Sequence, residues 1–388
     1  MEKYSRWSDL TTGTNPFVPH KQRLHDSLPV RALQVLGGTA LAVVRLPLVL
    51  VVGLVLVLTN VITSILVRPT VWVRAAAWST AQAPRRGLLC SLLLLLMGVL
   101  VTEEDANTRR LGLVANNAKG KHASSSARVG AGDVVVCNHT SFVEVLYLAR
   151  RFSPVFLFVT EEGASKGLVH VCGLIEALVR ALSLPVAHDR ATPRKLVDVI
   201  ARASGPVVIF PEGARSNGKS VLRFLPILEH LPLTQGTGAR KVATRVHVVA
   251  FRYEYKNFSP SHSAGGAWKH VLWTFFYAYH SLRVTHLNAK DLDLQALTPT
   301  TSSSSSFRAA KSATASDNKH ATLSGAQVER LRGLLAAMLR SKPVDLTVKD
   351  FVSFNRYWDH VTGGGKKSAA EFTDRKAPHE HAQWTTRQ

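Results

Sequence analysis

Short apolar runs alternate with helix-like segments through the middle of the chain. The runs are rich in β-branched residues and bounded by Gly, Pro or polar positions; they occur at 133–137, 155–159, 206–210 and 246–251. That pattern is typical of short buried strands. Segments of helical period lie between them, at 145–149, 167–182 and 194–203. Alternation of this kind predicts an α/β fold whose largely parallel sheet is flanked by helices.

Two longer apolar stretches precede this region. The first, 46–67, holds 22 residues without a charge between Arg45 and Arg68. At about 1.5 Å per residue, it could cross a hydrocarbon core of about 30 Å. The second, 88–101, has only 14 residues, and the loop between them is basic. Because basic loops tend to stay cytosolic, we predict a hydrophobic helical hairpin over 46–101 inserted into one leaflet rather than two full spans. A buried pair of core helices is the alternative.

Composition divides the rest of the chain. We predict a polar interfacial segment (1–45), a flexible linker (102–132), a folded α/β domain (133–297), a disordered insertion (298–322), a helical segment (323–361) and a disordered tail (362–388). Ser324 and Gln327 have capping-box spacing at the start of the helical segment.

The net charge limits the classes of binding partner, and the cysteine content limits the redox compartment in which the protein is expected. The net charge of +22 implies attraction to an anionic partner, which could be nucleic acid, an acidic membrane surface or a phosphorylated small molecule. The apolar stretches favour membrane lipids as the anionic partner, because a protein that binds nucleic acid does not need such stretches. The three cysteines lack metal-ligand spacing, and their odd number argues against a disulfide framework. We therefore expect the main domain to face a reducing cytosol.

Candidate catalytic chemistry follows the first predicted strand, in the sequence Asn138-His139-Thr140-Ser141-Phe142-Val143-Glu144. His139 and Glu144 are about 500° apart on an ideal helix, so they can meet only if His139 lies in the turn before it. A carboxylate that orients an imidazole makes a general base for a hydroxyl group. The alternative is that Ser141 and Glu144 form a capping box, in which the carboxylate only satisfies a helix amide.

A second polar elbow, Phe210-Pro211-Glu212-Gly213-Ala214-Arg215-Ser216, follows another predicted strand. Gly213 gives the backbone the freedom that a tight loop needs. Arg215, at the carboxyl edge of a sheet, suits bidentate recognition of a phosphate. The alternative is a strand end with a solvated arginine.

These two segments resemble signatures of the glycerolipid (1-acylglycerol-3-phosphate) acyltransferases. The elbow is similar to the FPEGTRS motif, with Ala214 in place of Thr, and the first segment is similar to NHxxxxD, with Glu144 in place of Asp. Asp189-Arg190 matches the end of the family's second motif, and residues 246–250 occupy the place of the fourth without its prolines. Met1 to Trp7 and residues 13–17 are similar to the start of fungal lysophosphatidic acid acyltransferases of the endoplasmic reticulum and lipid droplets.

The resemblance implies an acyl-CoA-dependent enzyme that converts lysophosphatidic acid to phosphatidic acid. His139 is then the general base with Glu144 as its partner, and Arg190, Glu212, Gly213 and Arg215 bind the substrate. Acyl-CoA is a cosubstrate, with no metal or prosthetic group. The implied location is the endoplasmic reticulum membrane or lipid droplets, with the acyltransferase domain (133–297) facing the cytosol. Two alternatives stay open: another lysophospholipid as acceptor, or a lipid-surface scaffold that keeps the fold with little activity.

Overall fold

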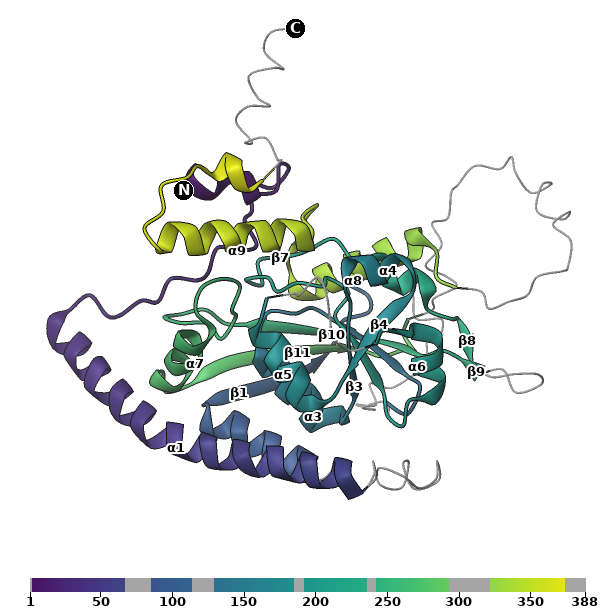
Figure 1. Cartoon of the computed structure of the whole chain (residues 1–388), viewed down its shortest axis with the longest axis horizontal. Helices are drawn as coiled ribbons and strands as arrows, with labels where there is room; N and C mark the ends of the chain where they lie inside the picture. The colour runs from purple at the N-terminus through teal and green to yellow at the C-terminus, as the bar shows by residue number, and fades with distance from the viewer. Residues whose placement is uncertain are drawn as a thin grey trace, which may run out of the picture.

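The computed structural model describes residues 2–66, 85–113, 129–184, 192–235, 242–292 and 322–373. The strands of its main sheet are β1 (Val99–Asp105), β2 (Val134–Cys137), β3 (Val155–Phe158), β4 (Leu168–Cys172), β5 (Arg194–Lys195), β6 (Val207–Ile209), β10 (Val246–Tyr253) and β11 (His280–Leu287). They lie in the order β1-β11-β10-β2-β6-β3-β4-β5; β1, β11, β10, β3 and β4 are labelled in Figure 1. Neighbours from β10 through β2 and β6 to β3 are parallel. The predicted α/β fold with a mostly parallel sheet is therefore confirmed.

Helices cover both faces of the sheet. They are α1 (Leu28–Leu66), α3 (Phe142–Phe152), α4 (Glu161–Ser165), α5 (Leu174–Leu182), α6 (Leu196–Arg202), α7 (Ala267–Phe276), α8 (Gly325–Leu339) and α9 (Val348–Thr362), and residues 85–96 are helical as well. Alternate residues of β2 point to opposite faces: Val134 and Val136 join a core that includes α6 and α8, whereas Val135 and Cys137 join one that includes α3 and α5. This two-sided burial explains why the central strands are almost entirely apolar.

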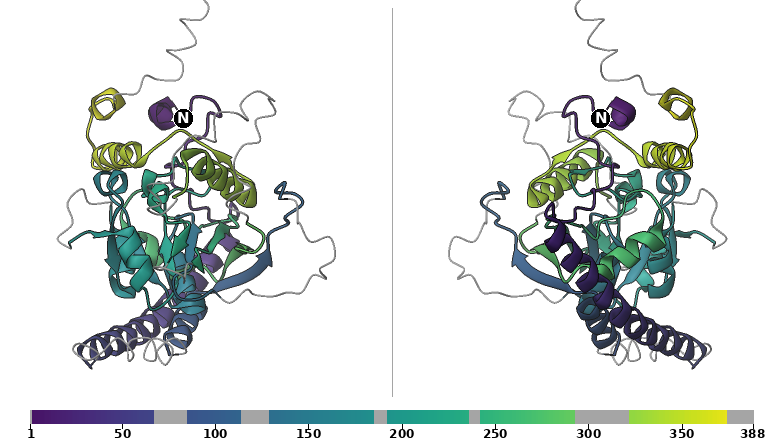
Figure 2. Two further views of the ribbon diagram at one scale, coloured as in Figure 1. Left: turned by 90° about the vertical axis from the view of Figure 1, so that its right-hand side faces the viewer. Right: turned by 90° about the vertical axis from the view of Figure 1, so that its left-hand side faces the viewer.

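Among the described residues, α1 is the helix long and apolar enough to cross a membrane. It spans 39 residues, and many of its apolar side chains are exposed, for example Leu33 at 71% and Leu36 at 70%. Its Arg45 donates to the carbonyls of Tyr277 and Ala278 at 2.7 Å each, just after α7. α1 therefore lies along the α/β domain, at the end opposite α9 (Figures 1 and 2).

The predicted polar interfacial segment, 1–45, needs correction. α1 begins at Leu28, so residues 28–45 are helical. Trp7 and Phe17 are fully buried instead of being free to face a lipid surface. Trp7 stacks on Tyr357 with ring centroids 5.0 Å apart, and Phe17 packs against Phe354 at 5.7 Å. Burial of these large rings on α9 is favourable enough to order the N-terminal segment.

The second arm of the predicted hairpin, 88–101, also differs. Residues 85–96 are helical, but Val99 already pairs with His280 in the register of β1 and β11. The last residues of the apolar stretch therefore belong to the sheet, where their backbone amides and carbonyls form hydrogen bonds with β11. β1 continues to Asp105, which shortens the predicted linker. Residues 67–84, between the two arms, and residues 114–128 of the predicted linker lie outside the described residues.

The C-terminal predictions are partly confirmed. The helical segment 323–361 forms α8 and α9, and the capping box of Ser324 and Gln327 is present. The predicted disordered tail, 362–388, is wrong in its first part, because Ala369–Phe372 forms a 3₁₀ helix (η3) whose Phe372 packs on Tyr357. Most of the predicted insertion (293–321) and the end of the tail (374–388) lie outside the described residues. The segment 167–182 is a strand followed by a helix, β4 and α5, rather than one helix.

Candidate active site

The turn between β2 and α3 brings His139 and Glu144 together. Ser141 is the N-cap of α3, and its side chain accepts a hydrogen bond from the Val143 amide. His139 therefore lies before the helix, and Glu144 lies in its first turn. Nδ1 of His139 is 3.0 Å from Oε2 of Glu144, and the two residues are 4% and 0% exposed. The predicted contact between these side chains is confirmed.

Glu144 also holds the turn that carries His139. Its carboxylate accepts the amide of Thr140 at 2.9 Å and the hydroxyl of the same residue. The capping-box alternative predicted a bond to the amide of Ser141, whereas the carboxylate reaches one residue further back. Glu144 thus fixes both the backbone next to His139 and the imidazole itself, which a cap alone would not do.

The imidazole is oriented for proton transfer. With Nδ1 donating to the carboxylate, Nε2 is the nitrogen that can take a proton. The ring packs on Phe210 with centroids 4.4 Å apart and meets the edge of Phe158 at 6.4 Å. These aromatic neighbours limit rotation of the ring, so the carboxylate contact and the packing select one orientation.

The elbow after β6 lies beside this turn because β6 and β2 are parallel neighbours. The Ser216 amide donates to the His139 carbonyl at 3.0 Å. Gly213 has φ +64°, and a Cβ there would lie 2.5 Å from Cδ1 of Leu225. Both the left-handed backbone and the close contact require glycine, so the predicted importance of Gly213 has a structural cause.

Glu212 holds the elbow from behind the cavity wall. It is fully buried, and its Oε2 accepts the Leu222 amide at 2.9 Å. Burial raises the pKa of this carboxyl to about 8, although the backbone amides of Leu222 and His139 lower it. The resemblance implies that Glu212 binds the substrate, whereas the structure shows its carboxylate in contact with the loop and not among the residues that line the cavity.

Arg215 is buried, not solvated. It is 3% exposed, its Nη1 donates to the carbonyl of Ala181 in α5, and its guanidinium lies 5.9 Å from the ring centre of Phe351. Burial lowers its pKa to about 10, so it stays charged at neutral pH. The solvated-arginine alternative is therefore wrong. Arg190, the other predicted phosphate ligand, lies outside the described residues.

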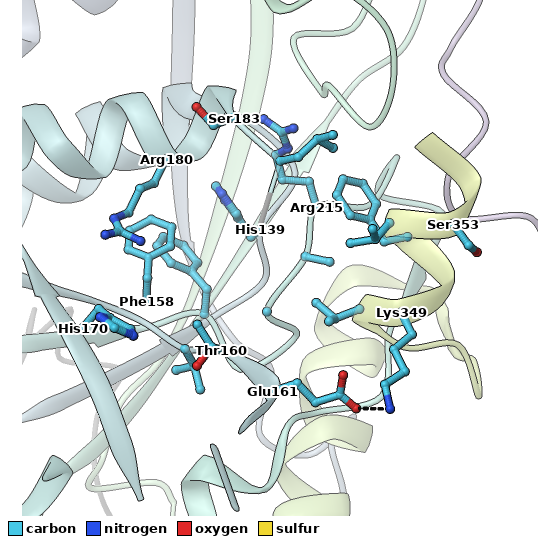
Figure 3. A pocket seen from close by; sticks show the side chains of 18 of the residues that line it. His139, Phe158, Thr160, Glu161, His170, Arg180, Ser183, Arg215, Lys349 and Ser353 are labelled. Carbon is cyan, nitrogen blue, oxygen red and sulfur yellow. Dashed lines mark ion pairs between the residues drawn. The ribbon is translucent and has the colours of Figure 1, made fainter. Parts of the chain in front are cut away.

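A cavity of about 1050 Å³ opens in front of these groups (Figure 3). His139, Phe210, Gly213 and Arg215 line it together with residues of α4, α5 and α9. Much of the wall is apolar, formed by Phe158, Val159, Val179, Leu184, Phe351, Val352 and Phe372. An ion pair of 3.0 Å between Glu161 and Lys349 joins α4 to α9 at its side. An apolar space of this size with a few placed polar groups suits an amphiphilic ligand.

Sequence reasoning missed three contributors to the site. Arg180 of α5 lines the cavity, lies 5.8 Å from the ring centre of Phe158 and bonds Glu176 at 2.9 Å. α9 lies at the end of the predicted helical segment 323–361, but nothing in the sequence pattern indicates that it lines the cavity. The side chain of Asn138 bonds both backbone groups of Phe251, at 3.0 and 2.8 Å. The asparagine beside the histidine therefore ties the turn to β10, a role that its position directly after a strand could have suggested.

The cysteines do not provide a nucleophile at this site. Cys137 is the nearest to His139 in sequence and is fully buried. Burial raises the pKa of its thiol well above the usual range, so the reactive thiolate is disfavoured.

Comparisons with models of known protein families, with curated proteins and with solved structures gave no match.

Proposed function

We propose that this chain is a membrane-associated acyltransferase that transfers an acyl group from acyl-CoA to lysophosphatidic acid and forms phosphatidic acid. The observation that carries the proposal is the His139–Glu144 pair, joined at 3.0 Å, facing a largely apolar cavity beside a buried arginine. The resemblance of both segments to acyltransferase motifs supports it independently of the geometry.

The proposed reaction is one displacement at a thioester. Nε2 of His139 takes the proton of the acceptor hydroxyl while the hydroxyl oxygen attacks the thioester carbonyl carbon. The carbon–sulfur bond then breaks, and the leaving CoA thiolate takes the proton from the imidazolium. Glu144 stabilises the imidazolium between these two steps.

Charge at the cavity supports an anionic acceptor. The buried Arg215 keeps its charge at neutral pH, and Arg180 lies on the same cavity. Guanidinium groups bind phosphomonoesters by paired hydrogen bonds, which are stronger in a poorly solvated site. The apolar wall offers room for an acyl chain of the acceptor or the donor.

The chain's surface supports location at a membrane. α1 exposes an apolar surface, and the net charge of +22 favours an anionic lipid surface. We include the endoplasmic reticulum or lipid droplets in the proposal, with the catalytic domain facing the cytosol where acyl-CoA is made available.

The proposal is tested by incubating the purified protein with labelled oleoyl-CoA and a panel of acceptors. Lysophosphatidic acid is expected to be converted, and lysophosphatidylcholine, whose phosphate is a diester, to react less well. Equal rates with both would favour the alternative of another lysophospholipid acceptor. His139→Ala is the test variant, and His230→Ala is the control, because His230 is a half-buried histidine outside the cavity whose ring bonds the Ser165 carbonyl at 3.1 Å. Product formation that survives His139→Ala would refute the mechanism.

A further inference from the structure

The N-terminal segment lies against the elbow that carries Arg215. The Asn217 amide donates to the Pro16 carbonyl at 2.7 Å, and its side-chain Nδ2 donates to the carbonyls of Asn15 and Val18 at 3.0 and 2.9 Å. His20 adds a ring-nitrogen bond of 2.9 Å to the Asn217 carbonyl. Four hydrogen bonds thus join residues 15–20 to a single residue, two positions after Arg215.

Asn15 shapes this segment for the contact. Its Oδ1 accepts the amides of Phe17 and Val18 at 2.9 and 3.1 Å, and its Nδ2 donates to the Tyr4 carbonyl at 2.9 Å. Such a turn directs neighbouring carbonyls outward, because the amides are bound by the side chain. The carbonyls of Asn15 and Pro16 are therefore presented to Asn217.

The same segment also holds α9. Trp7 stacks on Tyr357, and its Nε1 donates to Oγ of Ser353 at 2.7 Å. Phe17 is fully buried against Phe351, with ring centroids 5.6 Å apart. Phe351 lines the cavity and lies under the guanidinium of Arg215. One segment near the N-terminus therefore fixes Arg215 from two sides, through the backbone of the elbow and through the ring that supports its guanidinium.

We infer that residues 4–20 are a positioning strap that sets Arg215 for the phosphate of a single-chain phospholipid. The inference rests on the proposed function, because it assumes that Arg215 meets the acceptor's phosphate. The proposed catalytic chemistry gives residues 13–17 no role, but the strap does. Gly13 at φ +66° allows the chain to turn back toward Asp9, and Asn15 forms the turn that bonds Asn217. The strap acts through Arg215 and touches no reacting atom.

Direct binding tests this inference without acyl transfer. The affinity of the whole chain for lysophosphatidic acid is compared with that for a monoacylglycerol of the same chain length, which lacks only the phosphate. Asn15→Ala is expected to weaken lysophosphatidic acid binding by about tenfold, the scale of one charge-assisted hydrogen bond, and to leave monoacylglycerol binding unchanged. Asn15→Asp, which keeps the acceptor for Phe17 and Val18, is expected to recover most of the loss. Asn107→Ala, a turn asparagine that binds the Arg110 amide outside the cavity, is the matched control.

A double-mutant cycle separates positioning from general loosening. In an Arg215→Ala background, Asn15→Ala is expected to have no further effect, because the residue it positions is gone. Additive losses, or equal losses for both ligands, would overturn the inference, as would a loss of the same size in Asn107→Ala. No saturable binding of lysophosphatidic acid would overturn it together with the acceptor assignment. Binding without acyl transfer would refute the proposed function alone, and the cycle would still decide the role of the strap.

Discussion

Oε2 of Glu144 lies 3.0 Å from Nδ1 of His139, although the carboxylate is on a helix and the imidazole is in the turn before it. The contact depends on the N-cap Ser141, whose extended backbone ends the turn and starts α3. It also depends on Thr140, which binds the same carboxylate and keeps it directed backwards. A glutamate in place of the aspartate of the NHxxxxD motif is therefore compatible with an oriented histidine in this chain.

Loss of the charge at Glu144 is expected to reduce turnover strongly. Glu144→Gln keeps the shape of the side chain but can no longer stabilise an imidazolium, and its amide group can favour the wrong tautomer of His139. The expected fall in kcat is about 10²- to 10⁴-fold. Steady-state kinetics with lysophosphatidic acid and oleoyl-CoA provide the measurement. A kcat close to that of the unaltered protein would show that Glu144 only holds the turn through Thr140.

Glu212 is expected to make the protein less stable as the pH rises. Its pKa is raised from 4.5 to about 8 in the folded state, so between these values the folded protein binds a proton that the unfolded chain has released. The contribution of the protonated Glu212 carboxyl to the stability of the folded state is complete below about pH 4.5, and it is lost as the pH rises through the folded pKa of about 8.

Glu212→Gln removes this dependence while keeping an oxygen for the Leu222 amide. The variant is expected to gain stability over the unaltered protein between about pH 5 and about pH 8, by up to about 3 kcal/mol. Thermal unfolding in one detergent at both pH values measures the change. A constant difference between the two proteins across that range would mean that the carboxyl has no raised pKa.

Gly213→Ala is expected to destabilise the elbow by about 1–3 kcal/mol. The backbone φ of +64° is costly for alanine, and the new methyl would lie 2.5 Å from Leu225 and 3.2 Å from Val348. Gly37→Ala is the matched control: Gly37 is in α1, and its added Cβ would meet nothing within 4 Å. That control is expected to be neutral or slightly stabilising. Equal unfolding midpoints for Gly213→Ala and Gly37→Ala would contradict the proposed constraint.

Local signals account for what the sequence predicted well. β2 and β6 are apolar on both faces and bounded by turn residues, so their pattern identifies them without tertiary information. The contact of His139 with Glu144 spans five residues, and helix geometry alone limits how it can form. The resemblance of both segments to motifs of one family implied that they act in one site, and the structure shows that they follow the neighbouring strands β2 and β6.

Contacts between distant parts of the chain could not be predicted in the same way. Trp7 and Ser353 are 346 residues apart, and an aromatic, basic segment before an apolar helix reads equally well as a membrane-surface anchor. The helix that carries Ser353, α9, shows only an ordinary amphipathic pattern. The stretch 88–101 was predicted as an arm of a hairpin because it is apolar, although it has only 14 residues. It is short because it contains both the end of a helix and the start of an edge strand, β1.

His139 is proposed as the base of an acyl transfer to lysophosphatidic acid. This role is tested most directly by the initial rate at which the purified chain forms labelled phosphatidic acid from oleoyl-CoA and lysophosphatidic acid, with and without His139→Ala. Product is expected from the unaltered protein, with a loss of about 10³-fold or more in the variant and acceptor binding retained. No product from the unaltered protein, or the same rate in both, would contradict this role.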